Sequence, residues 1–473
     1  MKKLLKFLVL ILTGFCGNAQ IVTIPDANFK AKLLAADTTN TIAYNGLVAI
    51  KIDSNNNNEI EVSEALQVTG LNVTIADIYD LTGIGSFTTL RSLNCTQNHI
   101  TAIDLSTLTN LKSLYCSLNL LTSLDLTGLT SLVNLECAEN VLTQINFANL
   151  TSLQTVNCRF NFLTSLQLNV QTNLQSLNCD YNQLTILDVS NLTQLTYLAC
   201  QSNQFLNLNL SNLLNINFLN CSFNQLSTLD LSGLNDLTTL NCSHNQITAL
   251  DITDLSQLNF LNCESNLIGN AFLFSDMPDL HAVYCHENLI PSFGFSNVEN
   301  LQILDCSLNQ ISDLDVSSLP QLSVLNCNDN TQLVNLNIKN GNNEQFLNFS
   351  GNPNLIYVCA DEGQLTDIEN LITQYGYTNC DVNSLCDLAT NIFDLGEAFK
   401  VFPSPAKNYL QLQIQVSITI QSITIYDIIG QAVIIISTTK NVSPIDVSGL
   451  KTGIYFIELT SDKGTTIKKF LKA

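Results

Sequence analysis

The sequence predicts a mainly β chain: a solenoid of about 12 repeats of 21 residues with small caps that contain helices, followed by an antiparallel β-sandwich. Cysteines recur every 21 residues through the middle of the chain, and such a period is typical of a repeat array. Within each repeat a short stretch alternates apolar and polar residues, which predicts a strand. Residues 400–473 alternate with period two over longer runs, which favours a sandwich of paired strands.

Composition narrows the class of protein. The chain has 473 residues, of which 46% are hydrophobic and 12% charged, and its formal net charge is −22. That is too apolar for a disordered chain. The negative field argues against nucleic acid as a partner. Residues 400–473 are the exception, because eight Lys stand against four acids there, and this shift predicts a separate module.

The first 19 residues read as a secretory signal peptide. Lys2, Lys3 and Lys6 precede a short apolar run, and small residues at Gly17 and Ala19 suit a cleavage site. The run is too short to span a bilayer. We therefore expect residues 1–19 to be removed on export and the mature chain to have no transmembrane segment.

Residues 20–87 should cap the open end of the array. Pro25–Leu34 predicts a short helix with Asp26 at its start. The stretch Asp53–Glu64 resembles the EF-hand calcium loop, and its single exit helix near Val62 looks more like the dockerin-type half motif. This resemblance implies a structural Ca²⁺ held by oxygens of Asp53, Asn55, Asn57, Glu59 (backbone), Glu61 and Glu64. Asn58 replaces the usual glycine, and Asn tolerates the left-handed backbone needed there. An Asn-rich polar turn without a metal is the alternative.

The array itself is expected over residues 88–358. Twelve cysteines mark it, at positions 95, 116, 137, 158, 179, 200, 221, 242, 263, 285, 306 and 327, and an asparagine follows each after three residues. The unit L-x-x-L-x-C-x-x-N-x-L-T-x-L-D-L resembles the leucine-rich repeat, with Cys where many members carry Leu. The resemblance implies a right-handed solenoid whose short strands line a concave face.

The cysteine column is best explained by packing. A straight row of thiols cannot converge tetrahedrally on zinc, and side chains that point in parallel have poor disulfide geometry. We expect small buried hydrophobes. The asparagine column should bond backbone groups where the chain leaves each strand.

Residues 359–399 should form the second cap and a linker. Thr366–Glu369 reads as a capping box that opens a helix ending near Gly376. Cys359, Cys380 and Cys386 flank this helix. In an oxidising compartment two of them should pair. Cys359 with Cys380 is favoured, although the sequence leaves all three pairings open.

The tail resembles a known export signal. Phe402–Ala406, Ile425–Gly430, Asp446–Tyr455 and the ending Lys468–Lys472 are similar to the C-terminal sorting domain of type IX secretion. The resemblance implies recognition by that machinery and passage across the outer membrane of a Bacteroidetes-type Gram-negative bacterium. It leaves release and surface anchoring open.

No catalytic constellation stands out, so we expect no enzyme. The sequence lacks H-E-x-x-H, G-x-S-x-G and a phosphate-binding glycine loop. Paired acids such as Asp104 and Asp125 belong to the repeat consensus and should be solvated surface.

Binding on the concave face is the better hypothesis. Residues beside the inward Leu and Cys must face out, and rings among amides suit protein hot spots or sugar stacking. The candidate ligand-binding residues are Tyr115, Tyr197, Phe218, Phe260, Tyr284, Asn220, Asn241 and Asn262. Protein binding or adhesion at a surface is the leading interpretation, polysaccharide binding is the alternative, and a degradative enzyme is a distant third.

Overall fold

The computed structural model describes residues 20–386, 399–414, 420–437, 444–461 and 464–473. The predicted signal peptide, residues 1–19, lies outside the described residues. The chain divides into two compact units, Met1–Gln171 and Thr172–Ala473, and each is described by itself.

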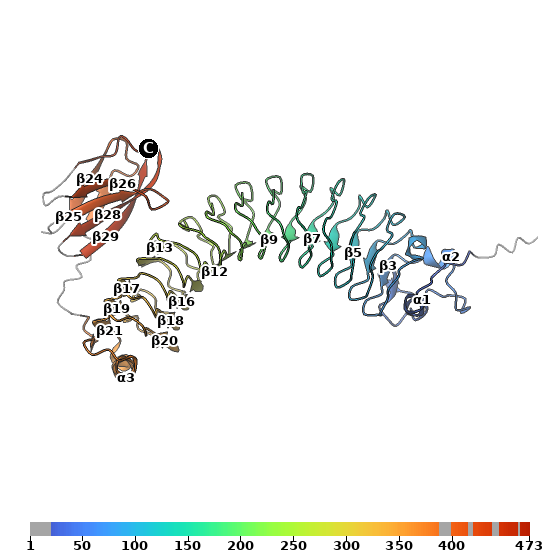
Figure 1. The fold of residues 1–473 in the computed structure, drawn as a ribbon, viewed down its shortest axis with the longest axis horizontal. Helices are drawn as coiled ribbons and strands as arrows, with labels where there is room; N and C mark the ends of the chain where they lie inside the picture. The colour runs from blue at the N-terminus through green and yellow to red at the C-terminus, as the bar shows by residue number, and fades with distance from the viewer. Residues whose placement is uncertain (1–19, 387–398, 415–419, 438–443, 462–463) are drawn as a thin grey trace, which may run out of the picture. The chain divides into compact units, whose positions relative to one another are not determined.

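The first unit opens with helix α1, Ala27–Leu34, where the sequence predicts a helix (Figure 1). The Asp26 carboxylate caps it by accepting a hydrogen bond from the Phe29 N–H at 2.8 Å. Phe29 and Leu33 form the buried face of this helix. A second short helix, α2, spans Val62–Ala65, and a 3₁₀ turn, η1, spans Ile84–Ser86.

Seven short strands complete the first unit. A small antiparallel hairpin leads into a parallel sheet, so the cap and the repeats share hydrogen bonds. The strands are β1 (Ala43–Asn45), β2 (Val48–Ala49), β3 (Gly70–Asn72), β4 (Ser92–Asn94), β5 (Ser113–Tyr115), β6 (Asn134–Glu136) and β7 (Thr155–Asn157).

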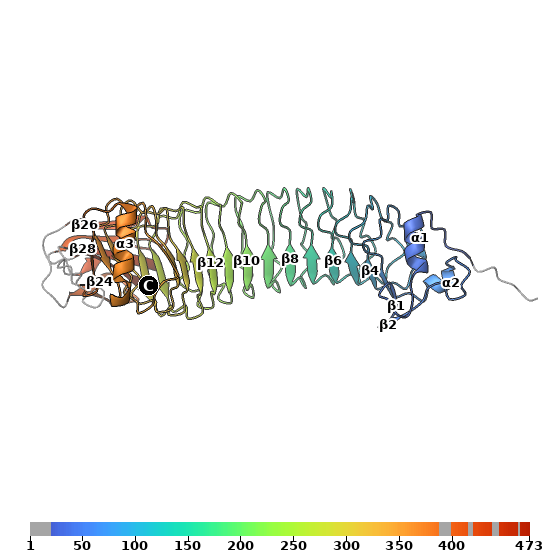
Figure 2. The same ribbon diagram turned by 90° about the horizontal axis from the view of Figure 1, so that it is seen from below.

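The second unit continues the repeat pattern with a long parallel sheet (Figure 2). Its strands are β8 (Ser176–Asn178), β9 (Tyr197–Ala199), β10 (Phe218–Asn220), β11 (Thr239–Asn241), β12 (Phe260–Asn262), β14 (Ala282–Tyr284), β16 (Ile303–Asp305), β18 (Val324–Asn326) and β20 (Phe346–Asn348). Further parallel strands form two smaller sheets in the later repeats. They are β13 (Phe272–Ser275), β15 (Phe293–Ser296), β17 (Asp313–Asp315), β19 (Asn335–Asn337), β21 (Tyr357–Cys359) and β22 (Asp381–Asn383).

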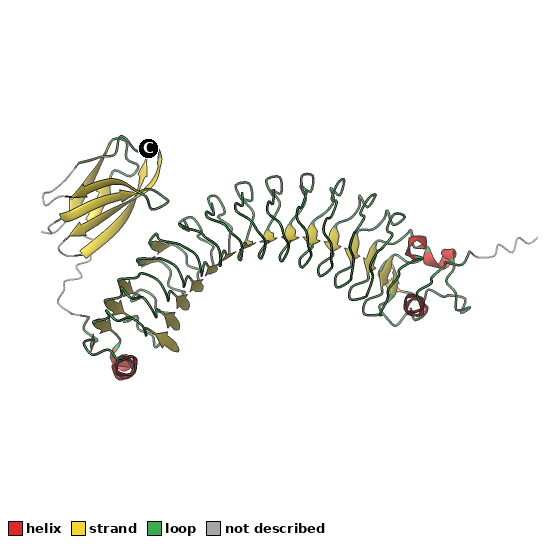
Figure 3. Cartoon of the chain, in the orientation of Figure 1, coloured by secondary structure: helices red, strands yellow, loops and turns green. Residues whose placement is uncertain are grey.

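The repeats of strands β4 to β11 place the strand on one side and loops on the other (Figure 3). Equivalent residues pair in register, as Leu219 does with Leu240. The middle Leu of a strand and the following Cys are fully buried. All twelve array cysteines are buried thiols, so packing explains the column. Desolvation by burial raises the pKa of the Cys95 and Cys221 thiols to about 12.

The column extends past the cysteines at both ends. Val73 follows β3 in the position that Cys95 takes after β4, and its carbonyl accepts the Asn98 Nδ2 at 2.9 Å. At the other end, Phe349 takes the cysteine position after β20 and Asn352 takes the asparagine position. The regular array is therefore longer than the twelve predicted repeats.

The asparagine column joins neighbouring repeats. Asn245 donates from Nδ2 to the carbonyl of Cys242 in its own repeat at 3.1 Å and to that of Cys221 in the preceding repeat at 3.0 Å. Its Oδ1 accepts the N–H of Leu226 at 3.0 Å. Asn119 and Asn309 make the same set of bonds. One buried amide thus satisfies backbone groups of two repeats.

The consensus acids on the loop side have a local structural role. The Asp230 Oδ1 accepts the N–H of Ser232 at 3.0 Å, and Asp104 accepts that of Ser106 at the same distance. Hydrogen bonds from Ser106 lower the pKa of Asp104. These carboxylates close turns on the surface.

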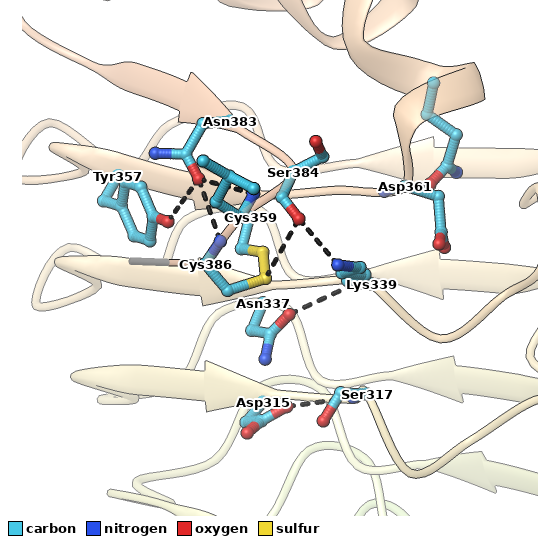
Figure 4. Close-up of a disulfide and its surroundings, with 12 residues drawn as sticks. Asp315, Ser317, Asn337, Lys339, Tyr357, Cys359, Asp361, Asn383, Ser384 and Cys386 are labelled. Atoms are coloured by element: carbon cyan, nitrogen blue, oxygen red, sulfur yellow. Dashed lines mark hydrogen bonds between the residues drawn. A yellow bond between two sulfur atoms is a disulfide. The ribbon is translucent and has the colours of Figure 1, made fainter. Parts of the chain in front are cut away.

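The C-terminal cap corrects the predicted disulfide. Cys359 is bonded to Cys386, with their Cα atoms 5.2 Å apart, so the predicted Cys359–Cys380 pairing is wrong (Figure 4). The reason is β22, which pairs in parallel with β21 and sets Cys359 opposite Asn383. Cys380 precedes that strand, whereas Cys386 lies in the turn after it. The Asn383 Oδ1 accepts the Cys386 N–H at 3.0 Å and supports this turn.

The predicted capping box also lies in a different place. Helix α3 spans Leu365–Tyr375 and ends at Gly376, whose φ of 77° is the left-handed conformation of a helix C-terminus. The box is formed one turn earlier by Asp361 and Gln364, around the 3₁₀ turn η2, Glu362–Gln364. Thr366 is already inside the helix.

The tail forms two antiparallel sheets around its own core. One contains β23 (Phe399–Phe402), β24 (Tyr409–Ile414) and β27 (Ile445–Asp446), and the other contains β25 (Ile420–Tyr426), β26 (Ala432–Ser437), β28 (Gly453–Ser461) and β29 (Gly464–Lys472). Alternate residues such as Ile423, Ile425, Ile457 and Leu459 are fully buried. The period-two pattern of the sequence therefore predicts this core correctly.

The asparagine column makes a direct stability prediction. Asn245→Ala leaves the Leu226 N–H without a partner and removes one of the two amide hydrogen bonds that the Cys221 and Cys242 carbonyls each accept, so we expect about 3 kcal/mol of destabilisation. Denaturant unfolding followed by circular dichroism measures it. Asn217→Ala, at an exposed position, is the matched control and should cost less than about 0.5 kcal/mol. Equal effects of the two variants would contradict the role of the column.

The buried thiols predict alkaline lability. Burial raises the pKa of array thiols such as Cys95 and Cys221 to about 12, so at these thiols the folded chain keeps protons that the unfolded chain loses above about pH 9. Each thiol should therefore remove about 1.4 kcal/mol of stability per pH unit between about pH 9 and 12. We expect array cysteines to resist iodoacetamide at pH 8 and to react, as the fold is lost, above pH 10. Mass spectrometry locates the label, and urea-unfolded protein is the control. Prompt labelling of array thiols at pH 8 would contradict their burial.

Candidate functional site

The outward side chains of strands β8–β12, β14 and β16 form what we term the strand face of the second unit. On β10, β11 and β12 the residues before and after the buried middle residue point out and are half-buried, whereas Ala199 of β9 and Ala282 of β14 are buried. The in-register pairing arranges them in two columns. Tyr197, Phe218, Thr239 and Phe260 belong to the first column, and the second contains Asn220, Asn241, Asn262 and Tyr284.

Two aromatic contacts stand out on the strand face. Tyr197 and Phe218, on adjacent strands, stack with centroids 4.4 Å apart and planes at 8°. Phe260 and Tyr284 lie 5.8 Å apart at 45°. Such pairs are stabilised beyond simple burial. The strand face therefore carries two preformed aromatic clusters.

The predicted amides are already partly engaged. The Asn241 Oδ1 accepts the N–H of Ser243 at 3.1 Å, and the Asn262 Oδ1 accepts that of Glu264 at 3.0 Å. The Asn220 Nδ2 also donates to the Gln201 Oε1 at 2.8 Å. What Asn241 and Asn262 can offer a ligand is therefore their Nδ2 donors.

Tyr115 belongs to the first unit, on β5, where it pairs with Asn94 and Glu136. The other seven predicted residues lie together on the strand face of the second unit.

One polar row was not anticipated from the sequence. The His244 Nε2 lies 3.4 Å from Glu264, whose other oxygen lies 3.5 Å from the His286 Nε2. The His286 Nδ1 is 3.8 Å from Asp305, too far for a hydrogen bond. The His244 ring also stacks on Phe223 at 4.1 Å. Glu264 and His286 each follow their cysteine by one residue and His244 follows its cysteine by two, so the row becomes visible only when neighbouring repeats are aligned.

The calcium-like loop has a compact polar interior. Asp53, Glu61 and Glu64 are buried, with 4%, 4% and 7% exposure. The Asp53 Oδ1 accepts the Asn57 N–H at 3.1 Å, and Asn57 donates from Nδ2 to Glu61 at 2.6 Å. Hydrogen bonds from Glu64 and then Asn57 lower the pKa of Glu61. Buried carboxylates thus face the loop interior.

The backbone of the loop has the turn expected of it. Asn58 has a φ of 62°, the left-handed conformation that the EF-hand pattern requires at this position. Glu59 donates its N–H to the Asn57 Oδ1 at 2.8 Å. Across the described ranges, no three His, Cys, Asp or Glu side chains are grouped closely enough to hold a metal. A cation here would therefore need the amide and backbone oxygens as well as the carboxylates.

The tail matches a known family. Residues 400–473 match the model of the secretion system C-terminal sorting domain. Such a tail implies export by type IX secretion to an extracellular or cell-surface location in Bacteroidetes. In the part of the chain that the structure describes, no helix has the length and apolar character of a membrane span.

Solved structures share the leucine-rich-repeat fold. The chain is similar to the functional domain of InlJ from Listeria monocytogenes, which includes a cysteine ladder. Identity is 25%, the TM-score is 0.55, and the match covers 96% of this chain and 98% of that one. A leucine-rich-repeat protein of Leptospira interrogans is 20% identical with a TM-score of 0.53, over 68% of this chain and 85% of that one. The comparison with curated proteins gives no match.

Proposed function

We propose that this is a secreted or cell-surface leucine-rich-repeat protein that binds a protein partner through the strand face of the second unit, without catalysing a reaction. The observation that carries the proposal is the Tyr197–Phe218 stack on adjacent strands. Half-buried, preorganised rings lose little entropy on binding and are typical of interface hot spots. The stack would anchor the partner, and adhesion at a surface would follow from export.

Charge around the rings supports a partner with basic groups. Glu264 and Asp305 lie on the same side of the sheet, each half-buried. Residues 89–360 carry twenty acids against four Lys or Arg. Complementary potentials speed association and select partners. A protein surface with apolar and basic residues fits this face.

Polysaccharide binding is the second candidate, favoured by the rings beside the Asn241 and Asn262 amides. Sugars stack on ring faces. One face of Tyr197 and one face of Phe218 are already occupied by each other, at 4.4 Å. We therefore rank a protein partner above a glycan.

The binding proposal predicts that one double variant loses affinity for the partner. Tyr197→Ala with Phe218→Ala should weaken binding about 100-fold, because hot-spot truncations cost roughly 2–4 kcal/mol. The measurement is biolayer interferometry against immobilised surface-protein fractions and polysaccharides, side by side.

A matched control comes from the same repeats. Leu206→Ala with Leu214→Ala removes two apolar side chains that are 59% and 57% exposed and lie outside the strands, and it should leave binding intact. The proposal is supported if the wild-type chain binds protein saturably, the Tyr197→Ala/Phe218→Ala variant (the ring variant) loses this binding, and the leucine control keeps it. Binding only to polysaccharide would favour the second candidate, and binding unchanged by the ring variant would contradict both.

We also propose that the loop Asp53–Glu64 binds Ca²⁺ as a stabilising ion. Asp53, Glu61, Glu64 and the Glu59 carbonyl supply oxygens, and Asn55 and Asn57 can supply theirs by rotating the side-chain amide. The ligands are hard oxygen donors of the kind Ca²⁺ takes. Burial of three acids in one short loop supports this proposal, because like charges buried close together repel one another unless a cation offsets them.

The calcium proposal predicts a shift in thermal stability. With a Kd of about 0.1–1 mM, 10 mM Ca²⁺ should stabilise the folded chain by roughly 1.4–2.7 kcal/mol. Differential scanning calorimetry with Ca²⁺ and with EDTA measures it. Asp53→Asn should abolish the shift, whereas the exposed Asp77→Asn should keep it. A melting temperature that Ca²⁺ does not change would contradict the proposal that the loop binds calcium.

A further inference from the structure

Strand β26 forms one edge of the four-stranded sheet of the tail. The sheet order is β26-β25-β28-β29, and β26 pairs with β25 on its inner side. Ile434 and Ile436 pack against the core. Val433 and Ile435 point outward and are 39% and 67% exposed. Within the described residues no strand pairs with the outer side of β26.

The turn before β26 extends this apolar surface. Ile428 and Ile429 are 46% and 64% exposed. Residues 428–437 include no charged side chain and no proline. We call the four exposed side chains Ile428, Ile429, Val433 and Ile435 the edge patch.

Apart from one register shift in its pairing with β25, beside Ile425 and Tyr426, this edge has none of the Lys or Pro residues with which natural proteins protect edge strands against pairing with other chains. The opposite edge strand, β29, follows the rule, since it carries the half-buried Lys468 and the exposed Lys469. One edge of this sheet therefore carries lysines, whereas the other edge carries exposed apolar side chains. An exposed apolar edge without Lys or Pro in a folded domain indicates a surface that becomes covered.

We propose that the edge patch is the surface by which the sorting domain docks on the secretion machinery, through an extended apolar segment of that machinery added beside β26. Strand addition supplies main-chain hydrogen bonds, and the alternate positions Val433 and Ile435 supply side-chain contacts. The inference rests on the family match of residues 400–473 and is independent of what the strand face binds.

A second copy of this chain fits the edge less well. Strand β26 has only six residues. Two such strands paired about a two-fold axis would bury far less than the roughly 1,200 Å² of a stable interface. A receptor that also contacts the turn at Ile428 and Ile429 can cover the whole patch.

The test is export of the full chain from a type IX-secreting bacterium. Val433→Lys with Ile435→Lys introduces the charges that other edges carry. We expect at least tenfold less protein outside the cell and its accumulation in the periplasm. Tyr409→Lys with Gln411→Lys places two lysines at the same spacing on exposed positions of the other sheet and should be exported normally.

Folding is checked by the melting temperature of each purified variant. If the lysine variant does not fold, Val433→Thr with Ile435→Thr keeps the β-propensity and should still reduce export several-fold. Normal export of a folded edge variant would overturn the proposal, and so would equal loss in the control. A wild-type dimer in solution that the edge variant dissociates, with export unchanged, would assign the patch to a second copy instead.

Discussion

The interaction on which the rest of the structure depends is the buried side-chain amide of the asparagine column. Where the chain leaves each strand, carbonyls that no sheet neighbour can reach would otherwise be buried without partners. One Asn Nδ2 bonds the carbonyls of two successive repeats, and its Oδ1 takes an N–H from the earlier one, as Asn245 does at 3.0–3.1 Å. An unsatisfied buried group costs more than a bond gains. The column therefore enforces the same turn in every repeat.

Because this backbone turn is repeated, it also creates the candidate binding face. Because each repeat leaves the sheet at the same point, equivalent residues pair in register, and one choice of side chain is copied into a column. Tyr197 and Phe218 stack because they hold the same position on neighbouring strands. The cysteines fill the space beneath, where small apolar side chains fit in register. Recognition residues can thus vary while the scaffold stays constant.

The sequence predicts most of this because the scaffold is periodic, and it fails where periodicity ends. The strands, the thiol packing and the two-sheet tail follow from spacing, and the cap helix follows from Asp26 as a helix-start residue. Val73 and Phe349 extend the column without a cysteine, so a search for Cys could not find them. The Cys359–Cys386 bond depends on strand β22, whose short stretch Asp381–Asn383 shows no repeat pattern. The His244–Glu264–His286 row combines two positions of three successive repeats, and a consensus of all repeats does not show which residue stands at these positions in one repeat.

Native-state hydrogen exchange of the amides bonded to the asparagine column tests the central role of these side chains most directly. The N–H groups of Ile247 and Leu226 donate to Asn266 and Asn245, both buried. Those of Ser190 and Ser232 make bonds of the same length to the exposed Asp188 and Asp230. If the column holds the repeats together, the first pair should exchange only through the largest opening events, at least a thousandfold more slowly than the second. Equal exchange rates for the two pairs would contradict this account.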